Sequence, residues 1–256
     1  MRAIISPAKS LNTTLEGAAS AASMPQFLSE AGALVQQMRD YDPVGLATLM
    51  HLSDSLAALN VARFAQWDAD HSDRTLLPAV FAFNGDVYQG LEVASLTEDQ
   101  VASVNTHIRI LSGLYGLLRP LDAFRPYRLE MGTKIQVGEA ASLAAFWRPK
   151  VTAALNTELD GQPLVNLASQ EYADAVDFKQ IEAPVITPVF KDWKGGQFKI
   201  ISFYAKRARG LMARFIALNA PRTEADLFDF TLGGYAYAPS LSQPGKPVFT
   251  RTLETA

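Results

Sequence analysis

The chain has 256 residues, of which 48% are hydrophobic and 19% are charged, a composition that excludes a disordered tail protein and a fibrous repeat. Its net charge of −3 gives the whole molecule no strong attraction to polyanions, so any nucleic-acid site must be a local patch. The absence of cysteine excludes disulfides, thiolate metal sites, iron–sulfur clusters and cysteine nucleophiles.

The hydrophobic segments are short throughout the chain. The N-terminal apolar run is far too short for the core of a signal peptide, and no window approaches the roughly 20 apolar residues of a membrane span. We therefore expect a cytoplasmic protein with no membrane association. No linker-like, charged or low-complexity tract divides the sequence, so we expect residues 1–256 to form one compact α+β domain.

The first third of the chain predicts one strand followed by several helices. Residues 3–6 form a β-branched apolar run that a proline closes, which predicts a buried strand. Between residues 24 and 67, apolar residues recur at helical spacing and predict several packed helices. The apolar and aromatic run at 78–83 precedes the turn sequence Asn-Gly-Asp and predicts a strand that enters a loop.

The middle and the end of the chain alternate helical and extended patterns. Thr97 and Gln100 have the spacing of a capping box, and the apolar residues that follow predict a helix up to Leu111, which Gly113 and Gly116 stop. We expect further helices at 143–159 and about 204–218, a short helix capped by Ser169, strands at 163–167, 185–190 and 198–203, and short β-like pieces in the tail.

Three serines lie at predicted strand ends: Ser6, Ser169 and Ser202. In parallel sheets such ends line the crevice where ligands bind. If these strands are neighbours, Lys9 and Lys206 face one cleft.

The strongest local signal is basic charge near the C-terminus. The segment 191–222 contains eight basic residues against Asp192 alone, a net charge of +7. At about 100° per residue, the basic side chains of its predicted helix occupy one half of the circumference and the apolar side chains the other. Such a face is either simply solvated or binds a polyanion, and the lack of interleaved acidic residues argues against the first interpretation. The basic positions on this face are Lys206, Arg207, Arg209 and Arg214.

A second basic cluster surrounds the glycine-containing stretch 111–118. The pattern predicts a hairpin between two helices, in which backbone N–H groups near Gly113 and Gly116 bind a phosphate and flanking arginines add bidentate contacts. A helix C-cap followed by an ordinary loop needs the same glycines, and spacing alone favours this alternative. The cluster consists of Arg109, Arg119, Arg125, Arg128 and Lys134.

Two predicted loops carry polar side chains that could form cleft walls. Asp86 and Tyr88 follow the strand predicted at 78–83, and Glu130 lies in the irregular stretch 126–132. Asp86 is equally explained as a turn cap, and Glu130 as the partner of an arginine. The three histidines are scattered without metal-ligand spacing, which disfavours a histidine metal site and a Ser-His-Asp triad.

Taken in order, six blocks of the sequence resemble the YaaA peroxide-stress protein family, and the resemblance spans nearly the whole chain. The blocks are SPAK at 6–9, FNGDVY at 83–88, LSGLYGLLRPLD at 111–122, PYRLEMG at 126–132, NLAS at 166–169 with Glu171-Tyr172, and FKIISFYAKRARGLMARFI at 198–216.

The resemblance implies a cytoplasmic bacterial protein that helps cells to survive hydrogen peroxide by limiting damage from unincorporated iron. It also implies a mixed α/β body with a positively charged cleft, and DNA binding through a helix-hairpin-helix-like element, which would correspond here to the Gly113–Gly116 turn and its flanks. Two residues separate these glycines, whereas the usual hairpin has one. Because cysteine is absent and histidine is not clustered, direct iron sequestration by soft or imidazole ligands is not expected.

We therefore predict a DNA-binding protein of the oxidative stress response that reads the backbone of duplex or branched DNA, with no cofactor, no metal and no obligate protein partner. The phosphate contacts expected are Lys206, Arg207, Arg209, Arg109, Arg119 and Arg128, with Lys9 and Lys199 in second rank.

The alternative is an enzyme that acts on a small anionic or nucleotide-like substrate, since polar side chains at strand ends are where active sites are built. A deep pocket that joins Lys9, Asp86 and Lys206 favours the enzyme, and a broad basic groove favours DNA. A protein-interaction scaffold is a third possibility. The cleft of the enzyme would contain Ser6, Lys9, Asp86, Tyr88, Glu130, Ser202 and Lys206.

Overall fold

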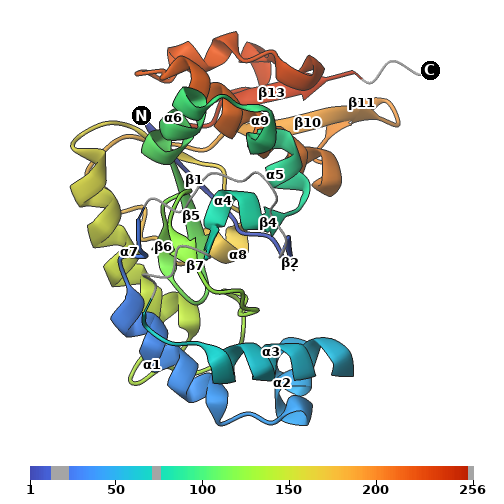
Figure 1. The fold of residues 1–256 in the computed structure, drawn as a ribbon. Helices are drawn as coiled ribbons and strands as arrows, with labels where there is room; N and C mark the ends of the chain where they lie inside the picture. Colours follow the sequence, from blue (N-terminus) through green and yellow to red (C-terminus); the bar gives the residue numbers. More distant parts are fainter. Residues whose placement is uncertain (13–22, 71–75, 253–256) are drawn as a thin grey trace.

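The computed structural model describes residues 1–12, 23–70 and 76–252 and confirms the α+β class (Figure 1). Its strands are β1 (Arg2–Ile5), β2 (Ser10–Leu11), β3 (Leu77–Pro78), β4 (Phe83–Asn84), β5 (Ile108–Ser112), β6 (Gly116–Leu118), β7 (Ala123–Phe124), β8 (Leu164–Asn166), β9 (Val185–Ile186), β10 (Val189–Lys194), β11 (Gln197–Lys199), β12 (Ala236–Tyr237) and β13 (Val248–Arg251). Its α-helices are α1 (Leu28–Arg39), α2 (Pro43–Met50), α3 (Asp54–Gln66), α4 (Ala79–Ala82), α5 (Asp86–Leu91), α6 (Glu98–His107), α7 (Leu143–Leu159), α8 (Gln170–Ala173) and α9 (Ser202–Asn219).

The central sheet has the strand order β6-β5-β1-β8-β9. Strands β5, β1, β8 and β9 run parallel to one another, and β6 is antiparallel to β5. Strand β1 lies in the middle, where Ala3, Ile4 and Ile5 are fully buried. A continuous apolar run is typical of a strand covered on both faces, which explains why residues 3–6 signal their structure so clearly.

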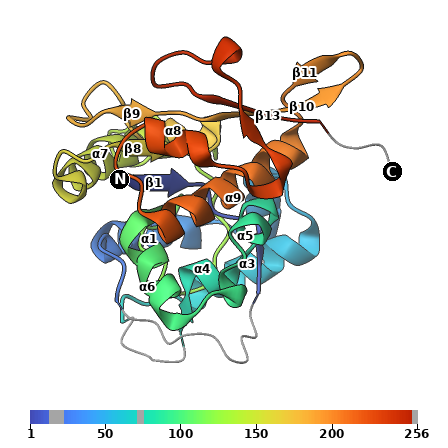
Figure 2. The same cartoon turned by 90° about the horizontal axis from the view of Figure 1, so that it is seen from above.

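A smaller sheet, with the order β11-β10-β13-β12, forms the upper part of the molecule in Figure 1. Helix α9 links the two sheets, because it contacts both β1 and β10. Seen from above, α9 crosses beneath β10 and β13 (Figure 2). One hydrophobic core cluster includes residues of both sheets and of α9.

Several elements lie where the sequence predicts them. Helix α7 has the expected bounds and is capped by Ser142, whose side chain accepts from the Ala145 N–H. The capping box of α6 is present between Thr97 and Gln100. The helical pattern at 24–67 corresponds to α1, α2 and α3, and the strand predicted at 163–167 is β8.

Two predicted strands are largely wrong. Residues 79–82 form α4, a single helical turn between the two-residue strands β3 and β4. The strand predicted at 198–203 ends at Lys199, and helix α9 already begins at Ser202. In both places a short apolar run is compatible with either structure, and the tertiary context decides between them.

The prediction of a hairpin between helices at 111–118 is also wrong. Helix α6 ends at His107, and residues 108–118 form the antiparallel β5–β6 hairpin within the central sheet. The turn is buried. A side chain at Gly113 would overlap the Leu129 carbonyl, and one at Gly116, where φ is +68°, would overlap the Trp147 ring. These glycines therefore allow close packing and present no amides to an outside phosphate.

A tight connection between two helices occurs elsewhere, between α2 and α3. His51 ends α2 in the left-handed conformation, with φ of 52°, and Ser53 caps α3. Among the described residues, no single helix has the length and apolar content of a membrane span, while α2 and α3 meet both criteria only as a pair bent by 110°.

Candidate functional site

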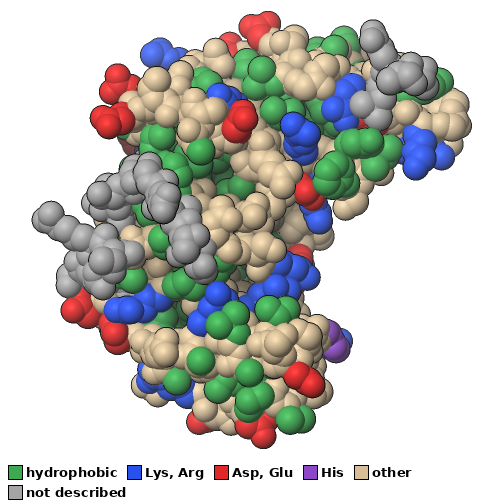
Figure 3. All heavy atoms as spheres, turned by 45° about the vertical axis from the view of Figure 1, so that its right-hand side comes forward, with side chains coloured by type: hydrophobic (Ala, Val, Ile, Leu, Met, Phe, Trp, Pro, Cys, Tyr) green, Lys and Arg blue, Asp and Glu red, His purple; other side chains and the backbone are tan. Residues whose placement is uncertain are grey.

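A cavity of about 480 Å³ opens on the side of the molecule where β2, β4 and α8 meet. Figure 3 shows this side hollowed between the upper part and the lower part of the molecule, with Lys and Arg side chains along the hollow. The cavity is lined by residues 6–10, 83–88, 127–130, Leu167, Ser169, Glu171, Tyr172, Lys206 and Arg209. It thus joins Lys9, Asp86 and Lys206, as the enzyme alternative requires.

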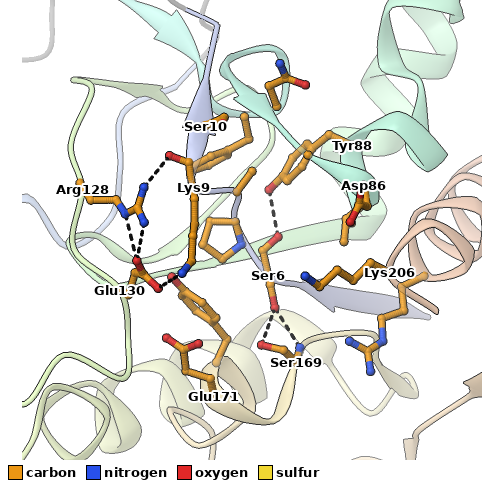
Figure 4. A pocket seen from close by; sticks show the side chains of 18 of the residues that line it. Ser6, Lys9, Ser10, Asp86, Tyr88, Arg128, Glu130, Ser169, Glu171 and Lys206 are labelled. Carbon is orange, nitrogen blue, oxygen red and sulfur yellow. Dashed lines mark hydrogen bonds and ion pairs between the residues drawn. The ribbon is translucent and has the colours of Figure 1, made fainter. Parts of the chain in front are cut away.

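The floor of the cavity is formed where two parallel strands end. Because β1 and β8 are neighbours, Ser6 and Ser169 meet just beyond them, as expected for strand ends in one sheet. The Ser169 N–H donates to Ser6 Oγ at 2.9 Å, and Ser6 Oγ donates to Ser169 Oγ at 3.2 Å (Figure 4). Ser169 precedes α8 as predicted, but its side chain makes no capping bond there. Ser202 begins α9 and does not line the cavity.

Tyr88 supports this floor through a hydrogen bond to Ser6. Its hydroxyl donates to the Ser6 carbonyl oxygen at 3.2 Å. Burial, followed by the neighbouring Tyr127 and Tyr172, raises the pKa of the Tyr88 phenol well above its ordinary value. The hydroxyl is therefore a neutral hydrogen-bond donor that fixes the end of β1, and not a proton acceptor.

One wall of the cavity is an ion-pair cluster of Lys9, Arg128 and Glu130 (Figure 4). The Glu130 carboxylate accepts from Lys9 Nζ at 2.8 Å and from Arg128 Nη2 at 2.7 Å. Arg128 Nη1 also donates to the Lys9 carbonyl oxygen at 3.3 Å. Glu130 thus pairs with an arginine, one of the two roles left open for it, and Lys9 and Arg128 already have a counter-charge.

We expect the Glu130→Gln variant to lose stability at neutral pH but not in acid. Burial raises the pKa of the Glu130 carboxyl, but the hydrogen bonds from Lys9 and Arg128 outweigh burial and lower it. A lowered folded-state pKa contributes stability above the unfolded-state pKa that is lost as pH falls. For this partly exposed cluster we expect up to about 1 kcal/mol. Urea unfolding of both proteins at neutral pH and below about pH 3 checks this, and a pH-independent difference would contradict it.

The opposite wall is set by a close crossing of two helices. A side chain on Gly90 of α5 would overlap the Arg207 carbonyl, and one on Gly210 of α9 would overlap the Val87 carbonyl. This contact holds Asp86, at the start of α5, beside the first turns of α9, from which Lys206 reaches the cavity (Figure 4).

The cations on this wall have no carboxylate partner. Within the described residues, the side chains of Lys206 and Arg209 make no hydrogen bond or ion pair. Burial lowers the pKa of the Arg209 guanidinium, although an arginine remains charged at neutral pH. A partly desolvated charge without a partner is costly, so this wall is suited to bind an anion.

The remaining predicted contacts lie elsewhere. Arg109 is 5% exposed and pairs with Glu158, and Arg119 lines a second cavity, of about 190 Å³, with that same pair. Arg214, which the sequence places on the basic helix face but not among the phosphate contacts, donates to the backbone carbonyls of Leu91 and Glu92. Lys199 and Arg207 are exposed near the start of α9 but do not line the cavity.

Two further residues of the sequence motifs, Tyr127 and Glu171, line the cavity and make hydrogen bonds that hold its walls together. The Glu171 carboxylate accepts from the Gly132 N–H at 3.0 Å, and thereby connects α8 to the loop that carries Glu130. Tyr127 is buried and shares a hydrogen bond of 2.6 Å with Ser112. Within the described ranges, no group of three or more His, Cys, Asp or Glu side chains could hold a metal ion.

Comparison with known proteins identifies the family. The family model described as peroxide stress protein YaaA matches residues 1–241. The chain belongs to this family. It is 50% identical over 254 residues to a UPF0246 protein of Tolumonas auensis, 49% identical over 253 residues to one of Methylibium petroleiphilum, and 46% identical over 254 residues to one of Aliivibrio fischeri. Each alignment covers 98% of both chains.

The match to the YaaA family extends over every element that forms the cavity, from β1 to α9. The resemblance expected from the six sequence blocks is therefore confirmed. Four of the blocks, at 6–9, 83–88, 126–132 and 166–172, supply most of the cavity lining in this YaaA-family protein. The block at 198–216 supplies its two unpaired cations, and the block at 111–122 contains the turn and the second strand of the buried β5–β6 hairpin.

Proposed function

We propose that this YaaA-family protein is a cytoplasmic protein of the peroxide stress response that binds duplex or branched DNA by its phosphates and limits iron-mediated oxidative damage. The observation that carries this proposal is the run of residues 193–207, which contains four basic and no acidic residues. Lys194, Lys199, Lys206 and Arg207 are all exposed. Their side chains make no ion pair with the described residues.

This set of contacts is smaller than the sequence predicts. Arg109, Arg128 and Lys9 have carboxylate partners in the protein, so they contribute little to the attraction of a polyanion. Of the predicted contacts, Lys199 on β11 and Lys206, Arg207 and Arg209 at the start of α9 have no ion pair with the described residues. Phosphates bound there would lie along the upper rim of the hollow in Figure 3. Such binding is independent of base sequence, because it contacts only the DNA backbone.

We expect the double variant Lys206→Gln/Arg207→Gln to bind a DNA duplex roughly 60-fold more weakly at about 0.1 M salt. Each phosphate contact raises log affinity by about 0.9 between about 1 M and about 0.1 M salt, and the variant loses two such contacts. The slope of log affinity against log salt becomes less negative by about 1.8. Fluorescence anisotropy across a salt series measures both. The matched control is Lys179→Gln, which removes the charge of an exposed lysine outside residues 193–207. Lys179 lies beside α7, because the carbonyl oxygen of its neighbour Gln180 accepts from the Asn156 side chain of that helix. Equal affinities for all three proteins would refute the proposal.

The link to oxidative damage is tested on the same proteins. Plasmid DNA treated with ferrous iron and hydrogen peroxide should acquire fewer strand breaks when the protein is present. The double variant should protect less well, in proportion to its weaker binding. Protection that is equal for both proteins would indicate that it does not depend on DNA binding.

A small-molecule site is the second candidate, and the cavity itself favours it. Its volume of about 480 Å³ falls within the usual range of ligand pockets, about 300–1,000 Å³. It combines the unpaired cations Lys206 and Arg209 with the carboxylates of Asp86 and Glu171. This combination fits an anionic or nucleotide-like substrate. Calorimetric titration with mononucleotides separates the two candidates, since saturable binding that Asp86→Asn or Arg209→Met abolishes would support the small-molecule site.

A further inference from the structure

The β10–β11 hairpin and the start of α9 form an exposed segment, residues 193–207, which we call the aromatic arm. Trp193 on β10 and Phe198 on β11 are cross-strand partners next to the turn at Gly195 and Gly196. The hairpin projects from the upper part of the molecule in Figure 1, and the same overhang forms the upper edge of the hollow in Figure 3.

The arm exposes large apolar side chains that the fold does not use. Trp193 is 45% exposed, Ile200 is 62% exposed and Phe203 is 53% exposed. By contrast, the other two tryptophans, Trp67 and Trp147, are 5% and 0% exposed. Single exposed apolar residues are ordinary, but three within one short segment of the chain favour an interaction site.

The rings of the arm are held in place. The Trp193 and Phe198 rings make an edge contact with their centroids 5.0 Å apart, and the Phe203 and Tyr204 rings make another at 5.7 Å. Each exposed ring is thus supported by a neighbour and retains a free surface. A rigid aromatic surface loses little conformational entropy when a flat partner stacks on it.

The charges of the arm select the partner. Lys194, Lys199, Lys206 and Arg207 alternate along the chain with the exposed rings, and the segment contains no acidic residue. The nearest acidic residue in the sequence, Asp192, is fully buried and bonded to Arg251 and Tyr235. An unpaired nucleic-acid strand has the complementary pattern, because each nucleotide presents one flat base and one negative phosphate.

We propose that the aromatic arm binds unpaired nucleotides of DNA, with bases stacked on Trp193 and Phe203 and phosphates on Lys199, Lys206 and Arg207. This inference rests on the proposed DNA binding and specifies the form of DNA that is preferred. A duplex hides its base faces and can use only the cations. DNA with unpaired bases can use the cations and the rings together, so it binds more tightly.

Trp193 is itself the reporter for the test, since the other two tryptophans are buried. We expect an oligothymidylate of about 12 nucleotides, a length typical of single-strand sites, to quench the tryptophan emission. Trp193→Phe should abolish the quenching and retain affinity, because a phenyl ring still stacks. Trp193→Ala should lower affinity roughly 5- to 150-fold, the loss expected for one base stack. The control is Leu59→Ala on α3, which removes a side chain of similar exposure, 44%, at the opposite end of the molecule (Figure 1).

The outcomes separate this inference from the proposed function. If duplex and oligothymidylate bind equally well, without quenching and without loss in Trp193→Ala, the arm does not stack on bases and DNA binding stands. If neither DNA binds, the proposed function fails and the inference fails with it. If vesicles of anionic lipid quench Trp193 and the oligonucleotide does not, the arm is a membrane contact and the inference is wrong. Circular dichroism of each variant confirms that it is folded.

Discussion

Replacing Gly210 by alanine should destabilise the protein by about 2–3 kcal/mol, the cost of overpacking a tight contact. Helix propensity alone predicts the opposite, since alanine in a helix is more favourable than glycine by up to about 1 kcal/mol. In this structure we expect the substitution to lower the free energy of unfolding instead, because a methyl group at Gly210 would overlap the Val87 carbonyl of α5. Urea denaturation followed by circular dichroism measures the change. The variant should also bind DNA more weakly, because the same crossing positions Lys206.

The matched control for this prediction is Gly32→Ala. Gly32 also lies within a helix, α1, but a methyl group there would lie 3.6 Å from the Trp67 ring, an ordinary packing distance. We expect this variant to be as stable as the parent or up to about 1 kcal/mol more stable. Equal effects of the two substitutions would show that the α5–α9 crossing has no special tightness.

Gly90 and Gly210 illustrate what sequence patterns do not contain. Gly210 lies in the basic helix, where the alternation of charged and apolar residues is informative, yet nothing local indicates that a second glycine 120 positions away packs against it. Close backbone approach is a property of two segments together. The sequence places Lys9 and Lys206 at one cleft only if their strands are neighbours, and β1 and β11 belong to different sheets. The α5–α9 crossing that brings Asp86 beside Lys206 could therefore not be predicted from local patterns.

Where the local signal and the tertiary structure agree, prediction succeeds. In the strand at 3–6, the helix that follows the capping box at Thr97 and the helix at 143–159, a clear hydrophobic pattern is combined with a residue suited to the end of the element. At 108–111 the signals conflict. Ile108 and Leu111 continue the helical spacing of α6 and equally suit a strand. Pairing with β1 decides the outcome, since Ile108 lies opposite Ala3 and Ile110 opposite Ile5.

Counting basic residues overestimated the phosphate-binding surface. Arg109 and Arg128 belong to a predicted basic cluster, but Glu158 and Glu130 neutralise them in the folded chain. Glu130 is two residues from Arg128, so that pair could be proposed from the sequence, whereas Glu158 reaches Arg109 from a helix 49 residues away. An acid-free segment does not predict free charge by itself, since residues 100–121 contain no acidic residue and Arg109 within them still pairs with Glu158. The free charge of residues 193–207 is established only by the folded structure.

The aromatic arm depends on a buried ion pair at its base. Asp192 immediately precedes Trp193 and is fully buried. It accepts from Arg251 Nε at 2.6 Å and from the Tyr235 hydroxyl at 2.9 Å. Burial, together with the hydrogen bond to Asp192, raises the pKa of the Tyr235 phenol, so the hydroxyl remains a donor. The Arg251 guanidinium also lies 4.9 Å from the centre of the Tyr204 ring, which connects β13 to α9.

We expect Asp192→Asn to lower the free energy of unfolding by about 3 kcal/mol, because it leaves the Arg251 charge buried without a counter-charge. The double variant Asp192→Asn/Arg251→Met should recover most of this loss, since it removes both charges and fills the space with an apolar side chain. Urea unfolding of the parent, both single variants and the double variant yields the coupling energy. Additive losses would show that the two side chains stabilise the protein independently. A strong coupling would show that the arm is anchored through this pair, and quenching of Trp193 by oligothymidylate should then return in the double variant together with stability.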